Sequence, residues 1–285
     1  MRRRSEFIAE GLTWIASLIP AILAGAIISF LLFNGASAIS WRFIAGFPER
    51  GGLEGGILPA IIGSIYISAL CMLIAAPIGI GAGTYLAEYA PDNLFTKIVR
   101  FFVELLAGIP SIVIGLFGYV FLVHGLGLGF SILSGAIALA FMILPWTVRV
   151  SEEAIRAVPR DYRYVSLALG ASKWKTIRNV VYVAARPAII TGLMLGLGKA
   201  VGETAVVMMT AGMGITGYIP VSPLDSARTL PVHLYLIAGE IANTSEGLKM
   251  AYGTALVLLA LFLMVSIPSL MLRNYFIRRL YGDAG

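Results

Sequence analysis

The hydrophobic positions of this chain fall into long stretches that carry no charged side chain, separated by short polar segments. A helix that crosses a lipid bilayer needs about 20 consecutive apolar residues. Between the third and fourth stretches, Gly125, Gly127 and Gly129 alternate with other residues and predict a turn. The pattern therefore predicts an all-α membrane protein with six transmembrane helices, over residues 12–33, 57–87, 101–123, 131–148, 187–211 and 251–272.

The composition agrees with this pattern and excludes several other classes of protein. Hydrophobic residues make up 59% of the 285 positions and charged residues only 13%, against about 45–50% and 25% in an ordinary soluble domain. Because so few charges cannot cover a water-facing surface, we expect neither a soluble enzyme nor a partner for nucleic acid. The single cysteine, Cys71, excludes a disulfide framework and a cysteine-rich metal site.

The basic residues indicate which loops face the cytoplasm, because Lys and Arg concentrate on that side of a membrane protein. With six spans, both termini lie on one side, together with 16 of the 21 basic residues. Four lie in the opposite loops, and Lys199 lies within the fifth span. We therefore expect a multi-pass protein of the cytoplasmic membrane with both termini in the cytoplasm. The first apolar stretch, of about 22 residues, exceeds the 7–15 residues of a signal-peptide core and favours an uncleaved helix.

Lys199 and Glu203 are charged residues that the pattern places deep inside the fifth predicted span. Twelve residues after Pro187, Lys199 would lie roughly 18 Å into the fifth helix, near the bilayer midplane. The spacing of four residues would place the Glu203 side chain on the same helix face. Because a charge at this depth is costly and is usually functional, we predict that Lys199 binds an anion and that the neighbouring carboxylate eases its release. A structural ion pair is the alternative.

The predicted cytoplasmic loop, residues 149–186, combines eight basic residues with Trp, Leu and Val. Pro159 is expected to end one short helix, Asp161 to cap a second, and Ser172 to cap a third that carries Trp174. Apolar residues on such a charged loop favour docking to another protein, and binding to anionic lipid is the alternative.

Signatures of catalysis are scarce in this sequence, so we expect no enzyme activity, cofactor or metal site. The pattern of a phosphate-binding loop fails before Lys199, because the required glycine is Leu193. The chain is therefore not expected to hydrolyse ATP by itself. The two histidines, His124 and His233, are both expected in solvated positions on the outer side.

Two segments of the cytoplasmic loop, residues 153–159 (EAIRAVP) and 168–177 (ALGASKWKTI), resemble the EAA loop of ABC importer permeases. Further stretches make the resemblance narrower, to the permease subunits of phosphate importers: residues 83–89 (GTYLAEY), 107–113 (AGIPSIV), 115–118 (GLFG), 195–198 (LGLG) and 202–205 (GETA). The resemblance extends over a core of residues 57–272, and residues 229–235 (TLPVHLY) make it closer to the PstA type than to the PstC type. It implies one permease domain, residues 1–285, with the type I (MetI-like) fold.

The resemblance implies a function in transport. A subunit of this kind translocates inorganic phosphate by alternating access. Its partners would be a second, PstC-like permease, two ATPase subunits, an extracytoplasmic phosphate-binding protein and the lipid bilayer. The loop 149–186 would couple the permease to the ATPases, and the residues carried over for this role are Glu153, Arg163, Ser166, Leu169, Gly170, Ala171 and Trp174.

The chain departs from the family pattern at three places, one of which is Tyr182-Val183, where the family has Leu-Pro. The basic residue before Gly-Glu-Thr is usually an arginine and here is Lys199, which lacks the planar fork that binds phosphate through two hydrogen bonds. The family's Glu-Ala-Ala is replaced by Tyr164, Val165 and Ser166, which removes an acidic residue from the expected ATPase contact. Three alternatives stay open: a permease for molybdate, tungstate or sulfate, a PstC-like subunit, and a stand-alone channel or membrane-embedded enzyme.

Overall fold

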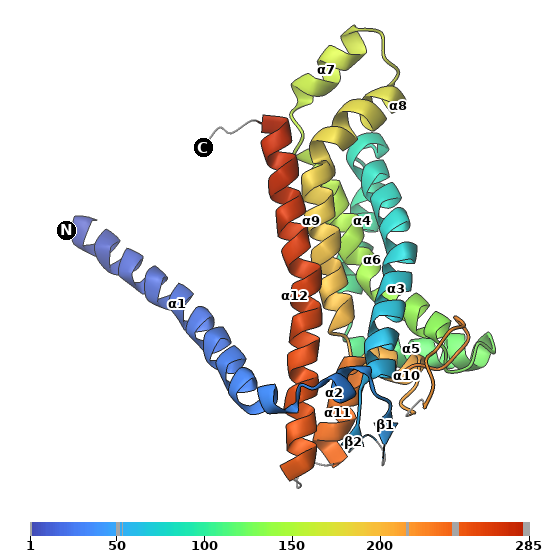
Figure 1. The fold of residues 1–285 in the computed structure, drawn as a ribbon. Helices are drawn as coiled ribbons and strands as arrows, with labels where there is room; N and C mark the ends of the chain where they lie inside the picture. Colours follow the sequence, from blue (N-terminus) through green and yellow to red (C-terminus); the bar gives the residue numbers. More distant parts are fainter. Residues whose placement is uncertain (1, 50–51, 53, 215–216, 241–244, 282–285) are drawn as a thin grey trace.

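The computed structural model describes residues 2–49, 52, 54–214, 217–240 and 245–281, and most of them are helical. Figure 1 shows long helices lying side by side. At one end, the inner end, lie α7 (Arg160–Ala168) and α8 (Lys173–Thr176). At the other, the outer end, lies a short antiparallel hairpin of β1 (Pro48–Glu49) and β2 (Glu54–Gly55).

The centre of the bundle is α6 (Ile132–Arg156), which packs against α3 (Leu58–Thr84) and α9 (Tyr182–Val201). Ile67 of α3 and Leu139 of α6 are completely buried in the main core. Two of the helices are extended at the inner end by π-helical turns. These turns are η3 (Tyr85–Tyr89), which follows α3, and η5 (Ile177–Val181), which joins α8 to α9.

Close packing of α3 against α6 depends on Gly79. A Cβ atom placed on Gly79 would lie 2.0 Å from Thr147 Oγ1, whereas one placed on Gly81 has no atom within 4 Å. We expect Gly79→Ala to lower the thermal unfolding temperature of the detergent-solubilised protein by several degrees, because overpacking costs about 1–3 kcal/mol. Gly81→Ala is the matched control and should leave this temperature unchanged. Equal unfolding temperatures for the two variants would contradict the close contact.

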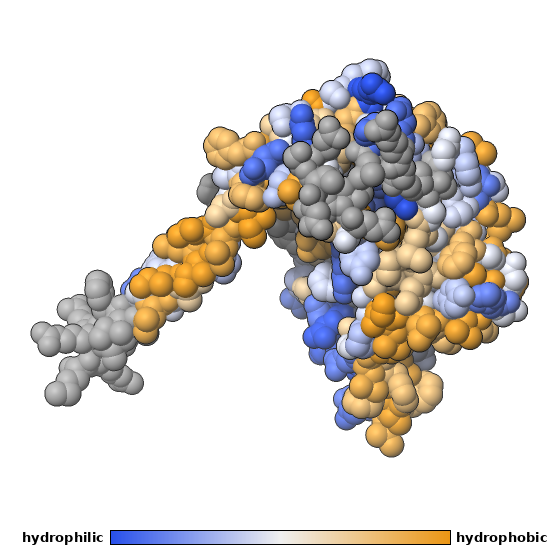
Figure 2. Space-filling model, turned by 90° about the horizontal axis from the view of Figure 1, so that it is seen from below, coloured by the Kyte–Doolittle hydropathy of each residue, from blue (hydrophilic) through white to orange (hydrophobic). Residues whose placement is uncertain are grey.

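The terminal helices are α1 (Arg2–Gly35) and α12 (Ser245–Tyr281). Helix α12 packs along α9, whereas α1 contacts α12 near the outer end and then projects away from the bundle (Figure 1). The projecting arm is predominantly hydrophobic in Figure 2, and the most apolar window of α1 has no buried residue. A helix that is apolar and exposed on all sides is suited to lipid or to another membrane helix.

Among the described residues, five helical segments are long and apolar enough to cross a membrane, and a bent helix pair raises this number to six. Each of the six predicted stretches overlaps one of these segments. The continuous segments are Glu10–Ala38, Leu58–Tyr89, Ile132–Arg156, Lys173–Val201 and Gly247–Leu272.

The bent pair shows that the single helix expected over residues 101–123 is wrong. Helices α4 (Leu94–Ala107) and α5 (Ser111–Gly118) meet at 94°, and α5 continues as the π-helical turn η4 (Tyr119–Gly125). The sequence between them contains Pro110, which disfavours helical backbone at the residue before it. The absence of charge from Leu105 to Val148 predicted two membrane-spanning segments, and the apolar character of this stretch did not reveal the break.

Short elements close the outer end of the bundle. The N–H of Leu230 donates to Ser64 Oγ of α3 at 2.8 Å, which fixes the start of α11 against α3. Their bounds are η1 (Ala36–Ala38), α2 (Trp41–Ala45), α10 (Ala205–Thr210) and α11 (Leu230–Glu240).

Candidate functional site

Lys199 lies in the last turn of α9. The glycines beside it pack against the middle of the bundle: a Cβ on Gly196 would lie 3.1 Å from Trp146 Cδ1, and one on Gly198 would lie 2.8 Å from Phe262 Cε2. Trp146 and Phe262 lie near the midpoints of α6 and α12. Lys199 is therefore at mid-depth of the bundle, at the end of a helix. The carbonyl groups at the carboxyl end of α9 stabilise a cation at this position.

The helix expected over residues 187–211 is interrupted, so the expected i,i+4 arrangement of Lys199 and Glu203 on one helix face is wrong. Helix α9 ends with Gly202 as its cap, and the chain resumes helical structure only in α10. Among the described residues, no ion pair joins Lys199 to Glu203. The Lys199 side chain is exposed and Glu203 is half-buried. The glycine is the sequence signal for this break.

An apolar groove of about 550 Å³ lies between α6 and α9 on the inner side of Lys199. Ala184, Ala188, Thr191 and Leu195 line it at helical spacing, and Lys199 follows one turn later on this face of α9. Because the lining is mostly apolar, the field of the lysine is screened less there than in water. This arrangement can attract an anion to the outer end of the groove.

The inner segment, which we define as residues 160–176, contains α7 and α8 and carries large exposed apolar side chains. Helix α7 has no buried residue. Leu169 is 83% exposed, Trp174 is 54% exposed, and Tyr164 and Val165 are each 61% exposed. Helix α7 lies outside the candidate membrane-spanning segments, and exposed apolar groups in such a position are typical of a protein–protein contact.

Two of the expected boundaries in this region are confirmed and one is wrong. Helix α6 ends at Arg156, just before Pro159, and the Ser172 side chain accepts a hydrogen bond from the Lys175 N–H at the start of α8. Asp161 does not cap α7, because Pro159 is already the N-cap residue and Asp161 lies inside the first turn. The polar loop is also shorter than the predicted residues 149–186, since α6 and η5 extend into it.

Gly170 and its neighbours fix the turn between α7 and α8. Gly170 has a φ of +81°, in the left-handed region that a glycine adopts without strain. The N–H of Ala171, which is half-buried, donates to the Ser166 carbonyl at 3.2 Å. The Ser166 and Thr176 hydroxyls lie 2.9 Å apart and join the two helices. These contacts hold Leu169 at the tip of the inner segment.

Two residues carried over for ATPase coupling make ion pairs within the chain. Arg163 is 18% exposed and lies 2.6 Å from the carboxylate of Glu88 in η3. Glu153 is exposed and pairs with Arg149 on α6 at 2.9 Å. In the sequence, Glu88 directly follows the predicted span 57–87, and a carboxylate at that position is the signal that could have indicated a basic partner.

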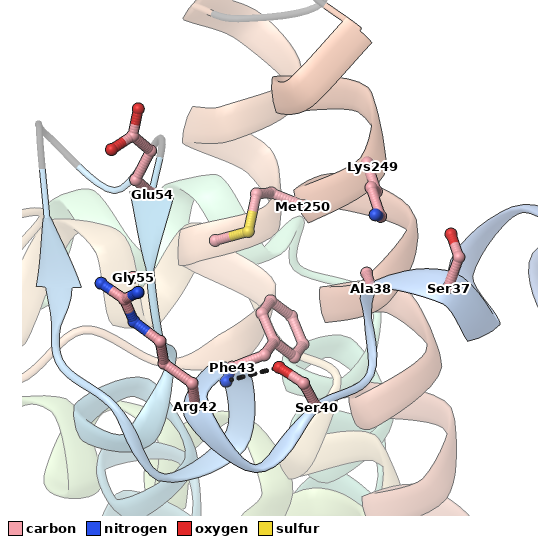
Figure 3. Close-up of a pocket in the computed structure, with 9 residues that line it drawn as sticks. All are labelled: Ser37, Ala38, Ser40, Arg42, Phe43, Glu54, Gly55, Lys249 and Met250. Carbon is pink, nitrogen blue, oxygen red and sulfur yellow. Dashed lines mark hydrogen bonds between the residues drawn. The ribbon is translucent and has the colours of Figure 1, made fainter.

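A pocket of about 370 Å³ opens at the outer end, between α2, β2 and α12 (Figure 3). Arg42 and Lys249 contribute cations to it from different elements, and Phe43 and Met250 contribute apolar surface. Arg42 is already paired with Glu49 at 3.3 Å. The pocket therefore combines both charge signs, and it is less suited than the region of Lys199 to concentrate an anion.

His233 is buried, so the expectation that it is solvated is wrong. Its side chain is 2% exposed, and its Nδ1 atom lies 3.2 Å from Nη1 of the nearly buried Arg228. Because arginine can only donate, Nδ1 accepts and the proton of the neutral ring is on Nε2. Nε2 has no hydrogen-bond partner among the described residues. The Arg228 guanidinium also donates to the carbonyl of Met213, which anchors the outer loop that follows α10.

Burial, and then the charge of Arg228, lowers the pKa of His233 from 6.5 to about 4. Between these values the unfolded chain binds a proton that the folded chain does not. The neutral ring thus contributes about 3 kcal/mol of stability, fully present above pH 6.5 and lost as the pH falls toward 4. We expect the unfolding temperature of the wild-type protein to fall between pH 7 and pH 5, and this fall to be smaller in His233→Asn. His124→Asn is the control, and an equal fall in all three proteins would contradict this role of His233.

Comparison with known proteins identifies the family. Residues 75–281 match the family described as binding-protein-dependent transport system inner membrane component. The probable ABC transporter permease protein YqgI of Bacillus subtilis is 41% identical over 82% of this chain and 83% of its own length. The phosphate transport system permease protein PstA of Xylella fastidiosa is 38% identical over 78% and 76%.

A solved structure confirms the predicted type I ABC importer permease fold. A chain of the inward-facing MetNI methionine ABC transporter superimposes with a TM-score of 0.63, at 16% identity, over 77% of this chain and 95% of that one. At this identity the likeness shows the fold alone. The sequence match, the fold and the apolar helices agree, and the chain belongs to the family of inner membrane components of binding-protein-dependent transport systems.

Proposed function

We propose that this chain is the PstA-type permease subunit of an ATP-driven importer of inorganic phosphate. The observation that carries this proposal is Lys199, a cation at mid-depth of the bundle and at the outer end of an apolar groove. The relatives named PstA support phosphate as the substrate. A point charge attracts phosphate without selecting its shape, so selectivity has to come from further groups, including those of the partner subunits.

A cycle of alternating access around Lys199 would explain why Lys199 and Glu203 lie near the outer end of an apolar groove. Phosphate arriving from the outer side is attracted to Lys199, and Glu203 beyond the helix break weakens this hold by like-charge repulsion. When the bundle opens inward, the apolar groove offers the anion no second binding point before the cytoplasm. ATP can drive this cycle only if the two states bind phosphate differently.

The partners follow from the two ends of the molecule. The exposed apolar residues of the inner segment would dock on ATPase subunits, and the outer end would receive a phosphate-loaded binding protein. A second, PstC-like permease would cover part of the exposed apolar surface. In this arrangement both termini and the inner segment lie in the cytoplasm, as the distribution of basic residues indicates.

Reconstitution into proteoliposomes tests whether the chain is a subunit of a pump. We expect phosphate uptake only when the chain is combined with a second permease, the ATPase subunits, a binding protein and ATP. The chain alone, at matched density, is the control. Uptake by the chain alone, without ATP, would favour the channel and contradict the proposal.

A further inference from the structure

The π-helical turn η3 is where the inner segment is attached to the bundle. Arg163 of α7 donates from Nε and Nη2 to the Glu88 carboxylate, at 2.8 and 2.6 Å. Lys173 of α8 donates to the Glu88 carbonyl at 2.5 Å and lies over the ring of Tyr89, 4.4 Å from its centroid. Both helices of the inner segment therefore attach to two consecutive residues of η3.

These polar contacts carry most of the attachment, because α7 offers no apolar anchor. None of its residues is buried, and its large apolar side chains, Tyr162, Tyr164, Val165 and Leu167, are all exposed. Arg163 also donates to the carbonyls of Ile155 and Val158 at the end of α6, at 2.8 and 2.7 Å. The guanidinium of Arg163 is therefore a direct route by which a force on α7 reaches both η3 and the end of α6.

The same turn is tied to two further helices. Arg100 of α4 and Arg156 of α6 both donate to the Leu86 carbonyl, at 3.2 and 3.3 Å. Both also pair with Glu152, whose side chain is 12% exposed, at 2.9 and 3.1 Å. Cations from α4, α6, α7 and α8 thus converge on one turn of five residues. Isolated π-helical turns of this kind are rare and are often found at functional sites.

Helix α3 continues from this turn to the opposite end of the molecule. There, Ser64 accepts a hydrogen bond from the Leu230 N–H, and a Cβ on Gly63 would lie 2.5 Å from the Arg228 carbonyl. A displacement of η3 along α3 therefore reaches the outer loops directly.

We propose that η3 is the junction through which movement of the inner segment is transmitted to the bundle, with Glu88 and Arg163 as its positioning residues. This inference rests on the proposed coupling to ATPase subunits, and it holds for any transported oxyanion. The junction makes α7 and η3 move as one body. When the contact between Glu88 and Arg163 is broken, ATP hydrolysis still moves α7, but α3 no longer moves with it.

The ratio of oxyanion transported to ATP hydrolysed, measured in proteoliposomes with the whole complex, tests this role. Glu88→Gln keeps the size of the side chain and removes its charge, and Arg163→Lys keeps the charge and removes the fork. We expect hydrolysis to continue in both variants and the transport ratio to fall about tenfold, the scale of a typical coupling between sites. Glu104→Gln is the matched control, since Glu104 is 62% exposed and lies 3.8 Å from Arg149 at the same end of the bundle.

A second measurement does not depend on the substrate. Spin labels on Asp161→Cys in α7 and Tyr85→Cys in η3 report the distance across the junction, and both positions are exposed. In the otherwise unaltered complex this distance should be the same with and without ATP, and in Glu88→Gln it should change when ATP binds.

The two measurements separate failure of the junction from failure of the proposed substrate. If the wild-type complex transports sulfate or molybdate in place of phosphate, the ratio is measured with that anion and the junction is tested all the same. An unchanged transport ratio in Glu88→Gln and Arg163→Lys would overturn the inference. An ATP-dependent distance between α7 and η3 in the wild type would overturn it equally.

Discussion

Replacing Lys199 by alanine is expected to abolish phosphate uptake while the complex still assembles. The side chain is exposed and makes no hydrogen bond or ion pair with the other described residues, so we expect its removal to leave the bundle folded. Losing a charged partner of the anion costs about 2–5 kcal/mol, which lowers uptake about 30-fold or more. The measurement is ATP-dependent uptake of radiolabelled phosphate into proteoliposomes, normalised to the amount of inserted protein.

Two further variants sharpen this test of Lys199. Lys97→Ala removes an exposed lysine that lies 3.8 Å from Asp92, and it should leave uptake unchanged. Lys199→Arg supplies the fork that binds phosphate through two hydrogen bonds, and it should retain uptake. Normal uptake by a well-inserted Lys199→Ala protein would contradict the role of Lys199 as the binding point.

Replacing Leu169 by aspartate is expected to prevent the ATPase subunits from binding. Leu169 is 83% exposed at the tip of the inner segment, so a partner that covers it would have to bury the new carboxylate. Losing one central apolar contact of an interface costs about 2 kcal/mol or more, and a buried, unpaired charge adds to this cost. Co-purification of the ATPase subunits with the tagged permease measures the effect.

The matched control for Leu169 lies at the other end of the molecule. Val221 is 81% exposed in the outer loop that follows α10. Val221→Asp introduces the same charge at a similarly exposed position and should leave ATPase binding unchanged. If Leu169→Asp retained the ATPase subunits as well as Val221→Asp does, the inner segment would not be their docking surface.

The membrane architecture could be predicted because it depends on composition over long windows. Stretches without charge in a chain of 13% charged residues leave little choice of where helices cross the bilayer. The rule for helix N-caps also predicted the start of α8 correctly: the Ser172 hydroxyl accepts a hydrogen bond from the Lys175 N–H. Such signals are contained in a few neighbouring residues, so no tertiary contact was needed to find them.

Breaks inside apolar stretches were harder to predict, because hydropathy does not register backbone geometry. The bend before Pro110 and the end of α9 at Gly202 both interrupt windows that are mostly apolar. The second break changes the candidate site, since Glu203 no longer shares a helix face with Lys199. A single glycine or proline in an apolar window is the signal that would have located each break.

Contacts between distant segments could not be predicted from one sequence. Glu88 and Arg163 are 75 residues apart, and their pairing depends on how α7 folds back on the bundle. His233 looked like a solvated loop residue because charge and hydropathy do not reveal that Arg228 and α3 enclose it. Both cases concern polar groups whose partners come from distant parts of the chain. Such pairs produce no periodic pattern in the sequence, so they cannot be found from spacing.

Competition between oxyanions for uptake tests the central proposal most directly. The complete complex is reconstituted, and ATP-dependent uptake of radiolabelled phosphate is measured with excess unlabelled phosphate, sulfate, molybdate or tungstate. Of these four competitors, we expect only unlabelled phosphate to suppress uptake of the radiolabelled phosphate. Suppression by sulfate, molybdate or tungstate at lower concentrations than phosphate, or phosphate uptake that needs no ATP, would contradict the assignment of this chain as a phosphate importer subunit.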